Sequence, residues 1–263
     1  MRPFKVKGGV CSGTVQNAGC ALAICGGDIY VWGESFDHDA PDVHAPRRLA
    51  GPAEAQAPFV SAGLNKNFAV AIDSRGAVWW WGEDSDMFHL DGLTWTLTRI
   101  PTLQHAVQVA VGHEHGLVLV ATGAVYGLGN NDFNQAAPLP VTDSKVHEPT
   151  LVAGLDGISV STVHAGDGTS FAVSGTGELF SWGAGFSGGL ATGTLKDRRT
   201  GPARVEAMRS VRSFGGSTGL VAIATNAETG NEEFYTWGYT CAYISADQPE
   251  YLLEPRRIQL GLA

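Results

Sequence analysis

Short runs of apolar residues, separated by turns rich in glycine, aspartate and serine, recur along the chain. In one unit an apolar run at 67–72 is followed by a turn at 73–76 and a second run at 77–81. The same plan returns at 117–126 and at 171–182. Runs of this length bounded by glycine turns predict antiparallel strands joined by hairpins. No long stretch has the 3.6-residue period of an amphipathic helix, so the pattern predicts an all-β chain with few, short helices.

An aromatic residue followed by glycine marks each unit, and these pairs lie 45 to 56 residues apart. A glycine precedes each pair, and an aliphatic residue in a segment marked by proline or arginine follows it. The pairs are Trp32-Gly33, Trp81-Gly82, Tyr126-Gly127, Trp182-Gly183 and Trp237-Gly238. The aliphatic landmarks are Leu49, Ile100, Leu151, Val205 and Ile258. Landmarks in one constant order predict five repeats in a single domain over 1–263, at approximately 1–49, 50–100, 101–151, 152–205 and 206–258.

Each repeat is too small to bury both faces of its own sheet, so it must stack on its neighbours. The large aromatic residue supplies apolar area to the seam between two sheets. The glycine after it permits a close backbone approach that a Cβ would obstruct. A radial arrangement of such sheets leaves only short, protected edges, and the sequence therefore predicts a β-propeller.

Two segments resemble the repeat of the regulator of chromosome condensation family. They are GHEHGLV at 112–118 followed by GAVYGLG at 123–129, and SWGAG at 181–185 followed by GGL at 188–190. The resemblance implies a propeller, usually of seven blades, that serves most often as an interaction platform. Family members act in nucleotide exchange on a small GTPase, as ubiquitin-ligase modules, as an ultraviolet photoreceptor and as secreted enzyme inhibitors.

The visible repeats are fewer than the resemblance implies. Seven units of about 50 residues need about 350 residues, and this chain shows five units in 263 residues. Two arrangements follow, a closed five-bladed ring or an incomplete seven-blade arc. An arc leaves sheet faces and edges that need cover, which favours a chain that works inside a larger assembly.

Composition and charge narrow the function classes. The net charge of −9 argues against nucleic-acid binding driven by overall charge. No apolar run approaches 18 residues, so the sequence predicts no membrane insertion. Four cysteines without C-x-x-C spacing predict neither a disulfide framework nor a zinc site. The expected location is intracellular, in the cytoplasm or nucleus, and the acid-free first 27 residues leave the mitochondrion as an alternative.

Several motifs suggest chemistry that the surrounding pattern does not support. Residues 183–189 contain both G-x-G-x-x-G and G-x-S-x-G, but no helix pattern follows them, so neither a dinucleotide site nor a nucleophile elbow is expected. His113 and His115 alternate on one predicted strand without an identifiable third metal ligand. The run 79–81 of three tryptophans is expected in the core. The sequence predicts no catalytic site, no cofactor and no metal.

Charged residues recur at fixed places in the repeats. Acids follow the aromatic-glycine pairs, at Glu34, Asp37, Asp39, Glu83, Asp84, Asp86 and Asp132. An arginine precedes the aliphatic landmark in four repeats, at Arg48, Arg99, Arg204 and Arg257. Equivalent positions on successive blades predict an arc of guanidinium groups. One interpretation is a surface for an acidic protein or for phosphate-rich RNA within a complex. The other, which we favour, is that each arginine pairs with an acid of its own or the next blade.

These observations together predict a non-catalytic interaction scaffold that is a subunit of a larger macromolecular assembly. The four arginines are its candidate partner-binding residues, and other protein subunits are its expected partners. A guanine nucleotide exchange factor for a small GTPase is the alternative implied by the resemblance. An enzyme-inhibitory propeller is the third possibility.

Overall fold

The computed structural model describes residues 11–17, 20–33, 43–49, 57–65, 68–82, 94–138, 143–226, 228–239 and 251–258. Every regular element within these ranges is a β-strand. Across the same ranges, no helix has the length and apolar character needed to span a bilayer.

The strands form five antiparallel sheets of four strands each, and within every sheet the strands lie side by side in chain order. The first sheet contains β1 (Cys11–Asn17), β2 (Cys20–Cys25), β3 (Asp28–Gly33) and β4 (Val43–Arg48). The second contains β5 (Phe59–Leu64), β6 (Phe68–Asp73), β7 (Val78–Gly82) and β8 (Thr94–Ile100). The third contains β9 (Ala106–Val111), β10 (His115–Val120), β11 (Val125–Asn130) and β12 (Lys145–Leu151). The fourth contains β13 (Val160–Ala165), β14 (Thr169–Ser174), β15 (Leu179–Gly183) and β16 (Arg198–Arg204). The fifth contains β17 (Val211–Gly216), β18 (Gly219–Thr225), β19 (Glu232–Tyr239) and β20 (Tyr251–Ile258).

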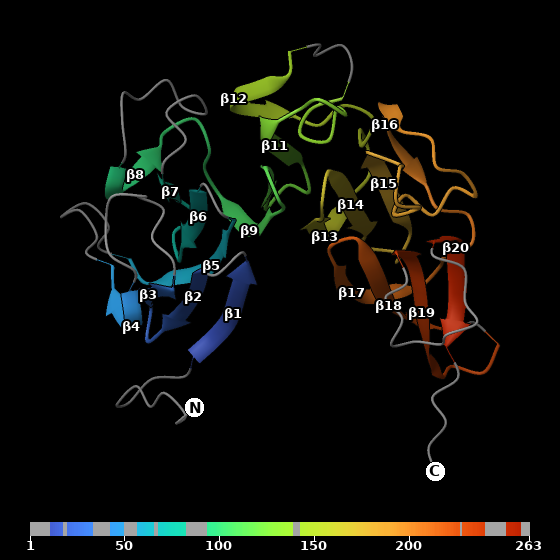
Figure 1. The fold of residues 1–263 in the computed structure, drawn as a ribbon, viewed down its shortest axis with the longest axis horizontal. Coiled ribbons are helices and arrows are strands. Elements are labelled where there is room, and N and C mark those ends of the chain that lie inside the picture. Colours follow the sequence, from blue (N-terminus) through green and yellow to red (C-terminus); the bar gives the residue numbers. More distant parts are fainter. Residues whose placement is uncertain are drawn as a thin grey trace.

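The five sheets are the blades of a propeller. Figure 1 shows them side by side along an arc, with the first strand of each sheet nearest the centre and the fourth strand outermost. The described strands of the first and fifth sheets stand at the two ends of this arc. The all-β propeller with five repeats, predicted from the sequence, is confirmed.

The core consists of apolar seams between neighbouring sheets. The three tryptophans of β7 serve two seams, because successive strand side chains point to opposite faces. Trp79 and Trp81 pack toward the first sheet, in a cluster with Leu22 and Ile29. Trp80 packs on the opposite side, in a cluster with residues of the third sheet. All three indoles are almost fully buried, as expected for core residues.

The third repeat differs from its prediction by two residues. In the other four sheets the glycine of the aromatic-glycine pair stands opposite the first residue of the second strand. In the third sheet Gly129 takes that place, opposite His115. Its φ of 94° lies in the same left-handed range as those of its four counterparts. Leu128 therefore occupies the aromatic position, and our assignment of that position to Tyr126-Gly127 is wrong.

One cysteine departs from the expected reduced state. Cys25, at the end of β2, is disulfide-bonded. The backbone register places it opposite Cys11 of β1. The sequence analysis did not expect this bond.

Candidate interaction surface on the hairpin rim

The four predicted site arginines take one structural position in successive blades. In each case the arginine lies on the fourth strand of its sheet, opposite an aromatic residue of the third strand. The opposed pairs are Tyr30 with Arg48, Trp79 with Arg99, Phe180 with Arg204, and Tyr235 with Arg257. In the third sheet Leu151 stands in the arginine position, opposite Tyr126. The aliphatic landmark of that blade is thus Val152, one residue later than predicted.

An acid of the same blade binds the arginine in three sheets. This acid lies two residues before the opposed aromatic residue, at the end of the hairpin between the second and third strands. The carboxylate and guanidinium are 2.8 Å apart for Asp28 and Arg48 and 3.0 Å apart for Glu233 and Arg257. The hydrogen bond from Arg48 to Asp28 raises the pKa of Arg48. These arginines neutralise an acid of their own blade, as in the interpretation we favoured.

The fourth blade extends the same pair into a small network. Arg204 donates from Nη1 to Glu178 Oε1 at 2.9 Å and from Nη2 to Glu206 Oε2 at 2.7 Å. Its hydrogen bond to Glu206 is the largest cause of the raised pKa of Arg204, and it lowers the pKa of Glu206. Arg209 adds a second guanidinium 3.6 Å from Glu206. Arg204 is thus held by two acids of its own chain.

The acid–arginine pair is broken in the second blade and absent from the third. Ala77 stands in the second blade where the other blades carry the acid, and Arg99 makes no ion pair with any residue that the structure describes. In the third blade both members are replaced, by Ala124 and Leu151. Leu151 is 48% exposed. The second blade therefore presents an arginine without the acid that binds it in other blades, and the third presents an exposed leucine.

A cavity of about 220 Å³ lies beside Arg99 on the second blade. We call it the basic pocket, because Arg75, Arg99 and His105 line it together with a single acid, Asp73. Asp73 accepts hydrogen bonds from the backbone N–H groups of Arg75 (2.9 Å) and Ala77 (3.0 Å). Its other oxygen accepts from the indole of Trp79 at 3.1 Å. The carboxylate is thus bound by three N–H groups, while both guanidinium groups have no ion pair within the described residues.

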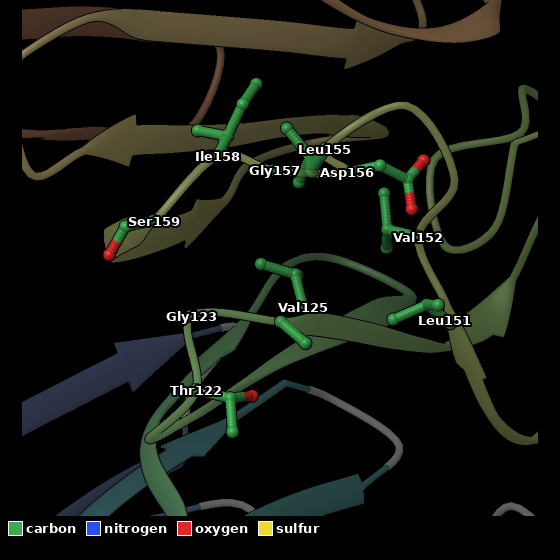
Figure 2. Close-up of a pocket in the computed structure, with 11 residues that line it drawn as sticks. Thr122, Gly123, Val125, Leu151, Val152, Leu155, Asp156, Gly157, Ile158 and Ser159 are labelled. Atoms are coloured by element: carbon green, nitrogen blue, oxygen red, sulfur yellow. The ribbon is translucent and has the colours of Figure 1, made fainter.

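A second cavity, of about 340 Å³, lies beside Leu151 on the third blade. Figure 2 shows the β10–β11 hairpin on one side of it and the segment 155–159 on the other. Val125, Val152 and Leu155 are buried in its walls, and Asp156 is the only acid among its described lining residues. We call it the apolar pocket.

The two pockets are neighbours on one rim of the propeller. The backbone N–H of Ala121 donates to the carbonyl oxygen of His105 at 2.8 Å. His105 lines the basic pocket, and Thr122, the residue after Ala121, lines the apolar pocket. One turn of backbone therefore separates them.

Comparison with known proteins identifies the architecture. A family model described as "Regulator of chromosome condensation (RCC1) repeat" matches residues 106–135, which include β9, β10 and β11. The crystal structure of human WBSCR16 superposes with a TM-score of 0.78 at 20% identity, covering 97% of this chain and 68% of that one. That of Prp20p from Saccharomyces cerevisiae superposes with a TM-score of 0.75 at 21% identity, covering 92% and 62%. The chain is an RCC1-like β-propeller.

Sequence relatives agree with this architecture. The probable E3 ubiquitin-protein ligase HERC3 of Homo sapiens is 31% identical over 156 residues, which are 59% of this chain and 14% of the relative. The RCC1 domain-containing protein RUG3, mitochondrial, of Arabidopsis thaliana is 27% identical over 194 residues, or 68% of this chain and 43% of the relative. The RCC1-like propeller spans less than half the length of these relatives. Propellers of this kind often serve in protein interaction or nucleotide exchange.

The glycine-rich motif at 183–189 joins two blades of the RCC1-like propeller. Its loop follows β15 without an intervening helix, and Gly188 adopts a φ of 71°. The carbonyl oxygen of Gly189 accepts a hydrogen bond from the indole of Trp237 in the next blade at 2.8 Å. Ser187 is buried in this loop. The loop of the preceding blade makes the same kind of contact, because the carbonyl oxygen of Gln135 accepts a hydrogen bond from the indole of Trp182 at 2.9 Å.

The two neighbouring histidines of the third blade have separate surroundings. His115 is fully buried and lies 2.8 Å from Ser170 Oγ through its Nε2. Burial lowers the pKa of His115 to about 3, which keeps its ring neutral. His113 is exposed, 3.8 Å from a carboxylate oxygen of Asp167. Among the described residues no three histidine, cysteine or acidic side chains gather as metal ligands.

The predicted acidic rim falls mostly outside the described residues. Those positions are Glu34, Asp37, Asp39, Glu83, Asp84 and Asp86. Asp132 is described and exposed, and it accepts a hydrogen bond from Asn130 Nδ2 at 3.0 Å.

Sequence reasoning missed Arg75 and the apolar pocket. The missed signal was the residue after the hairpin glycine, which is acidic at Asp28 and Glu178 but alanine at Ala77 and Ala124. That difference marks the two blades whose rim groups are not paired internally.

Proposed function

We propose that the chain is a non-catalytic interaction scaffold, a subunit of a larger macromolecular assembly, which binds partner proteins through the arginines of its hairpin rim. The four residues are Arg48, Arg99, Arg204 and Arg257. The observation that carries this proposal is the interrupted acid–arginine pair. An arginine is repeated around the rim, and in the second blade the acid that would bind it is replaced by Ala77.

The four arginines contribute unequally in this proposal. Arg48, Arg204 and Arg257 hold acids of their own blades, so a partner must compete with those carboxylates. Arg99 meets no such competition from the described residues, and its guanidinium can form bidentate bonds with a partner's carboxylate. Partner binding therefore depends most on Arg99.

The arc of blades supports a place within an assembly. Figure 1 places the first and fifth sheets at its two ends. Sheet faces and strand edges at such ends bury additional area when another chain covers them. The yeast RCC1 protein Prp20p, one of the structural neighbours, binds Gsp1p and histones and has also been solved bound to Kap60. Protein partners are the kind that we propose for this chain.

Cross-linking mass spectrometry of the native complex tests the proposal. The expected result is a set of cross-links from the second and third blades to other proteins. Charge reversal of all four arginines to glutamate should abolish partner binding, and Arg99→Glu alone should account for most of the loss. Partner binding that survives all four reversals overturns the proposal.

Guanine nucleotide exchange is the second candidate. The structural likeness to Prp20p, with a TM-score of 0.75, is the observation that favours it. An exchange factor accelerates release of labelled GDP from a purified small GTPase. Unchanged release across a panel of GTPases contradicts this candidate.

We propose an intracellular location, in the cytoplasm or nucleus, with the mitochondrion as the alternative that the mitochondrial relative supports. A fluorescent protein fused to the C-terminus of the full-length gene product tests this. Co-localisation with a matrix marker supports the mitochondrion, and nuclear or cytoplasmic signal alone contradicts it.

A further inference from the structure

The basic and apolar pockets together define the chemistry of a partner. We infer that they bind one extended peptide segment of a partner protein, which places an acidic side chain between Arg75 and Arg99 and an apolar side chain beside Leu151. This inference rests on the proposed scaffold function and adds the recognition chemistry.

The basic pocket selects an acid. Two guanidinium groups without ion pairs among the described residues line it, and Asp73, its acid, is already bound by three N–H groups. The protein as a whole carries a net charge of −9, so this local excess of positive charge runs against its average. A carboxylate entering the pocket gains charge-assisted hydrogen bonds from a planar donor fork.

The apolar pocket offers the exposed side chain of Leu151 to a partner's leucine, isoleucine or phenylalanine. Its volume of about 340 Å³ lies within the range typical of small-ligand sites. Leu151 is nearly half exposed there, and a partner's apolar side chain removes that area from water.

The positions of the two pockets indicate one extended segment. Ala121 and its hydrogen bond to His105 form the short wall between them. Asp156, at the rim of the apolar pocket (Figure 2), repels an acidic side chain and so fixes which way the segment lies. The apolar half also favours a peptide over RNA, whose backbone would place phosphates along both pockets.

Selection of peptides from a random nonapeptide phage library on the immobilised wild-type chain is the test. Enriched sequences should carry aspartate or glutamate within a few residues of a large apolar residue. Synthetic versions, labelled for fluorescence anisotropy, should bind about tenfold or more weakly to Arg99→Glu and to Leu151→Asp. Arg75→Glu is a second variant of the basic pocket.

Arg47→Glu is the matched control, because it makes the same charge change at an exposed arginine of the first blade. It should leave the anisotropy titration unchanged, and thermal melts should show that all variants are folded. Inorganic phosphate and a labelled uridine oligonucleotide form two further arms. Binding of the oligonucleotide in place of peptides, lost in Arg99→Glu, overturns the inference in favour of RNA.

Two further results also overturn the inference. One is the absence of enriched acidic-apolar peptides, and the other is equal binding to wild type, Arg99→Glu and Leu151→Asp. The change of all four rim arginines to glutamate separates this inference from the scaffold proposal. If either of these two results is found but the native complex still loses its partners on that change, the scaffold proposal stands while this inference fails. If partners remain bound after that reversal, the scaffold proposal itself fails.

Discussion

The buried imidazole of His115 makes the stability of the propeller dependent on pH. In the folded chain its pKa is lowered to about 3, with burial as the main cause, whereas an unfolded chain has a histidine pKa of about 6.5. As the pH falls below 6.5, the imidazole of the unfolded chain binds a proton, whereas that of the folded chain stays neutral. Folding stability is therefore lost progressively between pH 6.5 and pH 3. From pH 7.5 to pH 5 the loss from this one group is about 2 kcal/mol.

Urea denaturation at pH 7.5 and pH 5, followed by tryptophan fluorescence, measures this loss. His115→Gln keeps an amide donor near Ser170 but cannot be protonated, so the variant should lose about 2 kcal/mol of the pH dependence. Burial also lowers the pKa of His164. His164 therefore adds to the loss of stability at low pH by the same amount in wild type and in His115→Gln. Equal pH dependence in the two proteins refutes the reasoning. A direct check is the NMR signal of the His115 ring, which should not titrate down to pH 5.

Two further predictions concern seams and close backbone contacts. Gln108→Leu removes two 3.0 Å hydrogen bonds, to the backbone oxygen and nitrogen of Val163 in the next blade, and should lower the free energy of unfolding by about 1–3 kcal/mol in urea titrations. Gly127→Ala places a Cβ 1.7 Å from the carbonyl oxygen of Ala136 and should cost about 1–3 kcal/mol or more. Gly215→Ala, where no described heavy atom beyond the adjacent residues lies within 4 Å of the new Cβ, should change the melting temperature little. Equal melting temperatures for the two alanine variants contradict the close contact at Gly127.

The sequence predicted the architecture because each repeat carries its own apolar strands and glycine turns. It failed by two residues in the third blade, where Leu128 takes the aromatic position that we had assigned to Tyr126. Tyr126-Gly127 satisfies the same pattern two residues earlier, on the same face of the strand, since strand side chains alternate with a period of two. Periodicity alone cannot detect a shift of that size. The backbone register can, because it places Gly129 opposite His115.

The sequence predicted that the arginines take equivalent positions in successive blades, as the strand register shows, but their pairing with acids was not predictable in detail. Arg48 and Asp28 are 20 residues apart in sequence, and Arg204 and Glu178 are 26 apart. Their contact depends on the register of the third and fourth strands, which is set by residues far apart in the sequence. Likewise, the two pockets form between the hairpin of one blade and the loop that enters the next. Such sites arise from the stacking of repeats and have no contiguous motif.

The tryptophan indole hydrogen bonds across the last two seams run in one direction along the chain. The loop of the third blade accepts the indole N–H of the fourth, and the loop of the fourth blade accepts that of the fifth. Truncation from opposite ends therefore has unequal consequences. At this contact, removal of the fifth blade leaves the carbonyl oxygen of Gly189 without its donor, whereas a fragment that starts at the fifth blade retains an indole whose N–H has lost its acceptor. Either cut also exposes the apolar seam between the fourth and fifth sheets. At these two seams the later blade therefore depends on the earlier one to satisfy its buried indole N–H.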